Sequence, residues 1–273
     1  MTATVLAVTR DAGHYRLAGV VRSEWTKLRT VRSAQWMCLG FAATTIATGV
    51  IFSSVEASQW ARNAAAARAG LDPTDVSLKA ALTVGQLALG VLGILVMTDE
   101  YTTGMIRSSL AAVPSRPRLL AAKAVILALV TLMAGEAVSF ATFLAGQPVL
   151  RSGRAQYATL GEPGVLRAVA LSGGYLALLA LFGLGLGAII RHSAGAVAAY
   201  ATIMLVLPLL LAASPGHVAR FMPETILTSS VAAVIPQAAS QALPPGWDGF
   251  LVMAAYSAAA LLAGGALFWR RDA

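Results

Sequence analysis

Six long apolar stretches dominate this chain of 273 residues, of which 58% are hydrophobic and only 12% are charged. Soluble domains carry about 25% charged residues, so a soluble fold of this size would expose much of the excess apolar surface. At about 1.5 Å of rise per residue, helices of these lengths can cross a hydrocarbon core of about 30 Å. The sequence therefore predicts an all-α membrane protein with six transmembrane helices. The predicted spans are residues 34–52, 80–97, 124–146, 168–190, 194–213 and 250–269.

The segment before the first span, residues 14–32, has the pattern of an amphipathic helix. Trp25 lies on its apolar face, and the opposite face carries Arg16, Arg22, Lys27 and Arg29. Such a helix lies in the membrane interface instead of crossing it. Glu24 interrupts the apolar face, and a carboxylate in that position requires a partner. The partner is either a basic residue of this chain, such as Arg32, or a group on a partner subunit.

A polar stretch, residues 98–123, separates the second and third predicted spans. It opens with the acidic pair Asp99 and Glu100 and closes with Arg116, Arg118 and Lys123 around two prolines. Its composition favours a short ordered helix, and acidic side chains near the start of that helix would favour its dipole. A segment this polar does not lie in lipid. We interpret it as a cytoplasmic docking element for a separate protein.

The loop between the fifth and sixth predicted spans contains five prolines. Within it, residues 224–235 are apolar and helical in pattern, and Pro223 is suited to the first helical turn. A dozen residues are too few to cross the bilayer, so the pattern predicts a short re-entrant or interfacial helix.

Two features lie inside the predicted spans. Glu136 is an acidic residue at lipid depth in the third span, and such groups usually face a cavity or a partner. It could line a substrate cavity, or it could be protonated or hydrogen-bonded to a neighbouring helix. In the fourth span, Gly183 and Gly187 form a pair of small residues that permits close helix approach, with packing inside the chain favoured over dimerisation.

The distribution of Lys and Arg predicts the orientation of the chain. Six spans place both termini on one side, and the segments on that side, including residues 98–123, contain 13 Lys and Arg against 7 on the other side. The positive-inside rule therefore predicts that both termini and residues 98–123 are cytoplasmic. The net charge of +8 is explained by these topology markers, so no nucleic-acid partner is predicted.

No recognisable catalytic or nucleotide-binding motif occurs in this sequence. The HExxH, GxSxG and GxxxxGK[ST] patterns are absent, and the three histidines lie far apart. Cys38 is the single cysteine and lies in the first span. We therefore expect no enzyme activity, no metal site and no cofactor in this chain.

Two short motifs resemble a known family. The first is SEWTKLR at residues 23–29, and the second is EYTTGMIR at residues 100–107, followed by Pro114, Arg116 and an Ala-Lys pair at residues 122–123. With the six-span pattern, they resemble the permease subunit of a type-two ATP-binding-cassette exporter in the plasma membrane. The resemblance implies that residues 14–32 form the connecting helix, that the 98–123 segment inserts into the ATPase, and that residues 191–193 make a minor second contact. The implied coupling residues are Asp99, Glu100, Gly104, Met105, Arg107, Pro114, Arg116 and Arg191.

The resemblance also implies the partners. Two permeases, identical or paralogous, would pair in the lipid membrane and bind a dimer of cassette ATPase subunits, which would hold ATP and Mg²⁺. The apolar spans favour a lipophilic or amphiphilic substrate, such as a drug, an antibiotic or a lipid. An ion-coupled transporter or channel is the alternative, although only Glu136 is acidic within the spans. A third possibility is a non-transporting membrane anchor of a larger complex.

Overall fold

The computed structural model describes residues 32–112, 115–211, 221–233 and 247–270, together with residues 19, 22, 23, 25 and 26. These residues form helices joined by turns, with no strand among them, and six of the helical segments are long and apolar enough to span a membrane. The prediction of an all-α polytopic membrane protein is confirmed. Of the predicted site residues, Glu24, Lys27, Arg29 and Pro114 lie outside the described part of the chain. The interfacial placement of residues 14–32 stays a prediction.

The six spanning segments agree with the predicted spans in number and order. They are α2 (Arg32–Gln59), α4 (Pro73–Thr102), α6 (Arg116–Ser152), α7 (Val165–Ile190), a fifth made of α8 (Ser193–Ala201), η1 (Thr202–Val206) and α9 (Leu207–Leu210), and α12 (Trp247–Arg270).

Most of these helices are longer than the apolar runs that predicted them. The second spanning helix, α4, begins at Pro73 and not at residue 80. Pro73 occupies its first turn, and the Asp72 side chain accepts a hydrogen bond from the Thr74 N–H at 2.8 Å. Both features are typical of a helix start. The third spanning helix, α6, likewise extends beyond its predicted span and continues through Pro148 to Ser152. Several spanning helices therefore extend beyond the apolar runs from which the spans were predicted.

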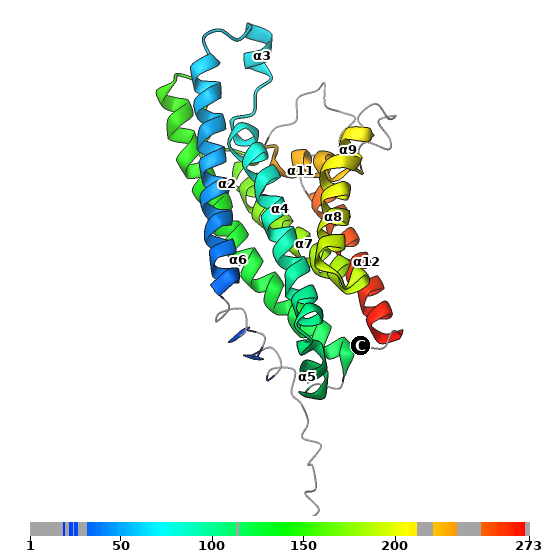
Figure 1. Cartoon of the computed structure of the whole chain (residues 1–273). Coiled ribbons are helices and arrows are strands. Elements are labelled where there is room, and N and C mark those ends of the chain that lie inside the picture. Colours follow the sequence, from blue (N-terminus) through cyan, green and yellow to red (C-terminus); the bar gives the residue numbers. More distant parts are fainter. Residues whose placement is uncertain are drawn as a thin grey trace, which may run out of the picture.

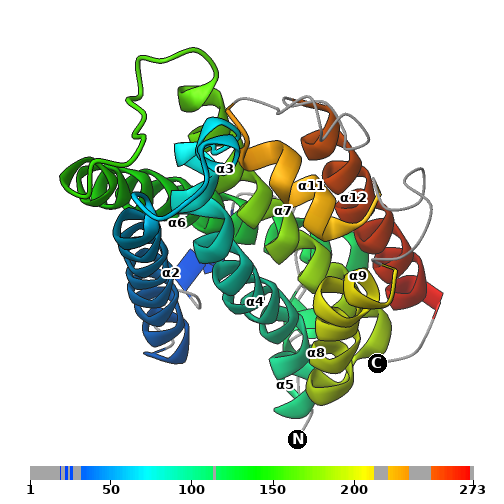
Figure 2. The ribbon, with the colours of Figure 1, turned by 90° about the horizontal axis from the view of Figure 1, so that it is seen from above.

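Helix α7 lies in the middle of the bundle (Figure 2) and contacts α4, α6, α8 and α12. Helix α2 lies at one edge, where it packs against α4 and α6. Large apolar side chains on the outer helices are widely exposed, among them Met133, Leu209 and Leu262, each with more than 70% of its surface accessible. This distribution is that of a bundle whose outer surface contacts lipid.

Close contact between α4 and α7 depends on glycine. A Cβ atom on Gly183 would meet the backbone carbonyl of Gly90, and one on Gly187 would lie 3.0 Å from the carbonyl oxygen of Ile94. The expectation that Gly183 and Gly187 support packing inside the chain is confirmed.

The two ends of the bundle differ (Figure 1). One carries α5 (Met105–Ala112), the starts of α2 and α6, and the end of α12, and we call it the α5 end. The other carries α3 (Ala65–Ala69) and α11 (Pro223–Val231), and we call it the α11 end. The first spanning helix begins and the last one ends at the α5 end, as six crossings require.

The short helix predicted between the fifth and sixth spans is present as α11, although it ends at Val231 and not at residue 235. It is held in place at both of its ends. The Tyr175 hydroxyl of α7 donates to the Pro223 carbonyl at 3.2 Å, and the Ala233 N–H donates to the Asp72 carboxylate at 2.7 Å. Helix α11 is therefore fixed against α7 and the start of α4.

Candidate functional site

The predicted coupling residues that the structure describes gather at the α5 end, in two groups. Asp99, Gly104, Met105 and Arg107 are exposed. Glu100 is buried, and Arg116 and Arg191 are partly buried. The first group can contact another molecule directly, whereas the second contacts the rest of this chain.

The helix of the polar stretch is α5, and it begins at Met105. Asp99 and Glu100 are instead in the last turn of α4. The prediction that this acidic pair favours the dipole at the start of the helix is therefore wrong, because both carboxylates lie at a helix C-terminus, where the dipole disfavours negative charge. The Asp99 carbonyl accepts hydrogen bonds from the Thr103 N–H at 3.0 Å and the Thr103 hydroxyl at 2.6 Å, which end α4.

The turn from α4 to α5 depends on Gly104, whose φ is +71°. Residues with a Cβ atom rarely adopt this left-handed conformation. A Cβ atom on Gly104 would have open space around it, with nothing within 4 Å. Backbone conformation, and not packing, therefore explains glycine at this position.

We expect Gly104→Ala to lower the free energy of unfolding by about 1–2 kcal/mol, the cost of placing an L-residue in the left-handed region. The measurement is denaturation of the purified protein in detergent. Gly40→Ala is the matched control, since Gly40 lies within α2, has no positive φ, and would have no neighbour within 4 Å of an added Cβ atom. Equal stability of the two variants would contradict the role given to the Gly104 backbone.

A buried ion pair joins the end of α4 to the start of α6. The Lys123 Nζ atom lies 2.8 Å from the Glu100 Oε1 atom, and the two side chains are only 2% and 8% exposed. Lys123 also lies 3.5 Å from the Val96 carbonyl oxygen, near the end of α4. The sequence pattern groups Lys123 with the exposed charges of the polar stretch, but the structure places it inside the bundle. Its ammonium group offsets the unfavourable position of Glu100 at the helix C-terminus.

Two arginines bind the end of α12. Arg116, at the start of α6, donates to the Phe268 carbonyl at 3.0 Å, with its guanidinium 5.9 Å from the Phe268 ring centroid. Arg191 donates to the Leu267 carbonyl at 3.3 Å and lies 5.3 Å from the Tyr101 ring centroid. Carbonyls in the last turn of a helix lack partners within the helix, and cations there are favourable. Arg191 therefore links the α7–α8 turn to both α4 and α12.

Helix α5 is attached to the bundle through one face. Ile106 is 4% exposed, and Leu110 packs partly against the core. Met105 and Arg107 are exposed and extend the surface that begins at Asp99 and Gly104. We call these four residues the α5 surface. Helix α5 contacts both α4 and α6, and Arg116 connects the start of α6 to the end of α12.

Glu136 lies at the contact between α6 and α7. A Cβ atom on Gly173 would lie 2.6 Å from the Glu136 carboxyl carbon, so the carboxyl group is packed against the α7 backbone. This arrangement fits the alternative in which the group interacts with a neighbouring helix. A role of Glu136 toward a substrate stays a prediction.

The described residues contain no group of three or more His, Cys, Asp or Glu side chains placed to hold a metal ion. Cys38 lies on α2 as a free thiol. His192 is exposed in the α7–α8 turn, where its Nδ1 atom accepts the Gly195 N–H at 3.2 Å and caps α8. The charged groups of Glu100, Lys123, Arg116 and Arg191 instead connect neighbouring helices at the α5 end.

Sequence reasoning missed the Glu100–Lys123 pair and the contacts from Arg116 and Arg191 to α12. Each of these contacts joins residues far apart in the sequence, between 23 and 152 positions. No local spacing could have revealed them.

Comparisons of the chain with protein-family models and with curated proteins find no match.

Proposed function

We propose that this chain is the permease subunit of a type-two ATP-binding-cassette exporter and that a separate ATPase docks on the α5 surface. The observation that carries the proposal is a short helix between the second and third spanning helices, with an exposed side and with Ile106 and Leu110 packed against the bundle. The EYTTGMIR motif, which resembles the coupling segment of that family, covers the end of α4, the Gly104 turn and the start of α5. A carrier with no cytoplasmic partner would have no use for such a surface.

In this proposal the protein lies in the plasma membrane with the α5 end in the cytoplasm. The positive-inside rule supports that orientation, since Lys and Arg are concentrated in the segments of that end. Two permeases, identical or paralogous, would share an ATPase dimer that holds ATP and Mg²⁺.

The mechanism is a change between two packings of the bundle. Closure of the ATPase dimer displaces α5, and the Gly104 turn passes the displacement to α4. The Glu100–Lys123 pair makes the start of α6 move with the end of α4. Arg116 and Arg191 extend the movement to α12. A lipophilic or amphiphilic substrate would then cross at the interface of the two permeases.

The test is co-purification of the chain with a cassette ATPase, which we expect a neighbouring gene to encode. We expect the double variant Met105→Glu and Arg107→Glu to lower the amount of bound ATPase by about tenfold, because it replaces an apolar and a basic contact with two carboxylates. ATP-dependent transport should fall in parallel. Arg62→Glu is the control, since Arg62 is exposed on the α11 side of the molecule and its variant should bind and transport normally. Unchanged ATPase binding in the double variant would remove the α5 surface from the proposal.

Transport in membrane vesicles separates this proposal from an ion-coupled carrier. We expect transport to stop when ATP is depleted while the ion gradient is maintained. Transport that continues on the gradient alone would refute ATP coupling.

A further inference from the structure

One face of α6 carries a carboxyl group beside an exposed apolar stripe. Val125, Leu129, Leu132 and Glu136 follow one another at intervals of four, three and four residues, so they share one face of the helix. The three apolar side chains are 41–53% exposed, and Glu136 is partly exposed. We call these four residues the α6 face. Because α6 starts at the α5 end, the apolar stripe runs from Glu136 toward that end.

Glu136 lies near the middle of its spanning helix. It is 20 residues from the start of α6 and 16 residues from the end, which correspond to about 30 Å and 24 Å. The hydrocarbon core extends only about 15 Å to either side of its centre. The carboxyl group therefore lies at the depth of the lipid tails, where a carboxylate without a counter-ion is costly.

The neighbouring helix supplies backbone groups to Glu136 and no counter-ion. The carboxyl carbon packs against Gly173, and a backbone hydrogen bond is made with Gly174. In the part of the chain that the structure describes, the buried lysine at the α5 end pairs with Glu100, and no basic side chain pairs with Glu136. A positive charge beside the Glu136 carboxylate therefore has to come from another molecule.

We propose that the α6 face binds a lipophilic cation that reaches it from the lipid. The positive charge lies beside the Glu136 carboxylate, and the apolar groups of the ligand contact Leu129 and Leu132. Opposite charges attract each other far more strongly in an apolar medium than in water, so an anion of the same shape is rejected. A cation whose charge is enclosed by aryl or alkyl groups can enter the hydrocarbon, unlike a small hydrated ion.

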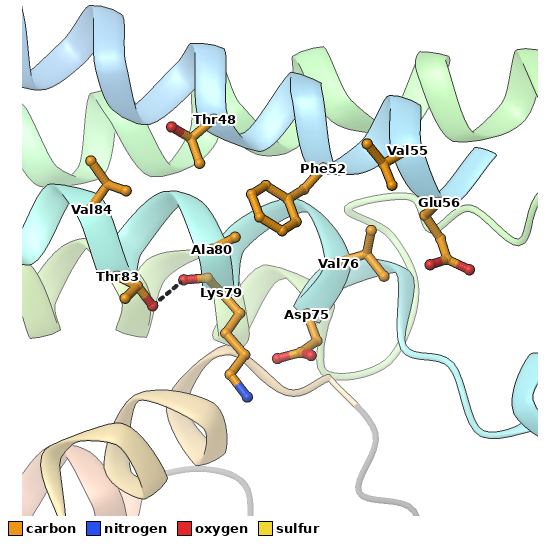
Figure 3. Close-up of a pocket in the computed structure, with 10 residues that line it drawn as sticks. All are labelled: Thr48, Phe52, Val55, Glu56, Asp75, Val76, Lys79, Ala80, Thr83 and Val84. Carbon is orange, nitrogen blue, oxygen red and sulfur yellow. Dashed lines mark hydrogen bonds between the residues drawn. The ribbon is translucent and has the colours of Figure 1, made fainter. Parts of the chain in front are cut away.

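The inference narrows the substrate of the proposed exporter to lipophilic cations. Its substrate role rests on the proposed function, whereas binding to the α6 face requires no ATPase. The α6 face is separate from the α5 surface. It is also separate from a groove of about 500 Å³ that residues of α2 and α4 line near the α11 end (Figure 3). That groove is the competing place for an apolar ligand, and a variant distinguishes the two.

The test is saturable binding of radiolabelled tetraphenylphosphonium to the full chain in phosphatidylcholine nanodiscs, with no ATP or ATPase present. We expect Glu136→Gln to raise the Kd by about tenfold, because it keeps the size of the side chain and removes its charge. Tetraphenylborate, an anion of the same shape, should show no saturable binding. Asp248→Asn is the matched control and should leave the Kd unchanged, since Asp248 is an exposed carboxylate in the first turn of α12, outside the α6 face.

Further variants locate the apolar contact. The double variant Leu129→Ala and Leu132→Ala should raise the Kd by about threefold, because it removes van der Waals contacts with the ligand. Leu144→Ala should leave the Kd unchanged, since Leu144 is an exposed leucine of α6 that lies outside the α6 face. Ala80→Trp, which would fill the groove between α2 and α4, should also leave it unchanged.

Equal Kd values for the parent and Glu136→Gln, or saturable binding of tetraphenylborate, would overturn the proposal. A rise in Kd caused by Ala80→Trp and not by Glu136→Gln would place the ligand in the groove and overturn it too. If a second copy of the chain covers the α6 face, the double leucine variant should change the oligomeric state and leave the Kd unaltered, which also refutes ligand binding there.

The substrate role has its own test. We expect vesicles that contain the chain and its ATPase to transport tetraphenylphosphonium when ATP is present, and Glu136→Gln to slow this transport. Binding without transport would refute the substrate role and leave the site in place. Loss of the ATPase interaction itself would refute the proposed function, and the nanodisc measurement would be unaffected.

Discussion

Loss of either partner of the Glu100–Lys123 pair is expected to lower the free energy of unfolding by about 3–5 kcal/mol, because it leaves one charge buried without its counter-ion. The relevant single variants are Glu100→Gln and Lys123→Met. The double variant Glu100→Met and Lys123→Met should recover most of this loss, since replacing a buried ion pair with apolar side chains of similar size is often neutral. The measurement is denaturation of the purified protein in detergent, analysed as a double-mutant cycle.

Asp99→Asn is the control for these variants. Asp99 is the neighbouring carboxylate in the same helical turn, but it is exposed, so its replacement should change stability by no more than about 0.5 kcal/mol. Single variants of the pair that are as stable as Asp99→Asn would show that the buried pair does not join α4 to α6. The double variant also separates stability from coupling: if the proposed coupling to an ATPase acts through the pair, this protein should fold and still bind that ATPase but transport more slowly.

The number and order of the spanning helices could be predicted because bilayer thickness acts on each apolar run separately. No tertiary contact is needed to decide that residues 168–190 cross the membrane. The helix ends were harder to predict, because a helix does not stop where its apolar residues stop. Asp72 and Pro73 start α4 in the polar region, and α6 continues through Pro148. The residues that determine these helix ends act locally in the sequence, but a hydropathy pattern does not include them.

The exposed residues of the candidate site could be predicted from composition, whereas the contacts of its buried residues could not. Met105 and Arg107 lie in a segment too polar for lipid, and the structure exposes both. Glu100 and Lys123 meet only because the end of α4 packs beside the start of α6. The contact of Arg191 with an ATPase stays a prediction, whereas its guanidinium binds the Leu267 carbonyl and lies over the Tyr101 ring, contacts that the sequence did not indicate. Such contacts depend on the packing of whole helices, which the sequence of one segment does not determine.

A second large effect on stability is expected at the α4–α7 contact, which depends on Gly93. A Cβ atom at this position would meet the Ala180 carbonyl oxygen and would lie 3.1 Å from the Leu184 backbone nitrogen. Backbone atoms of a helix cannot turn aside as a flexible side chain can, so even a small side chain must push the two helices apart. We expect Gly93→Ala to lower the free energy of unfolding by about 1–3 kcal/mol. Gly93→Leu should prevent recovery of a monodisperse folded protein from detergent.

Gly40→Leu provides the contrast, because Gly40 on α2 has nothing within 4 Å of a Cβ atom and leucine is the better helix former. This variant should be at least as stable as the parent, as judged by size-exclusion chromatography and thermal denaturation. If Gly93→Leu folded equally well, α4 and α7 could not be in backbone contact at this position. The expected difference also limits the transport mechanism that we propose. Helices that touch through their backbones at Gly90, Gly93 and Gly183 cannot separate without losing this contact, so α4 and α7 should move together when α5 is displaced.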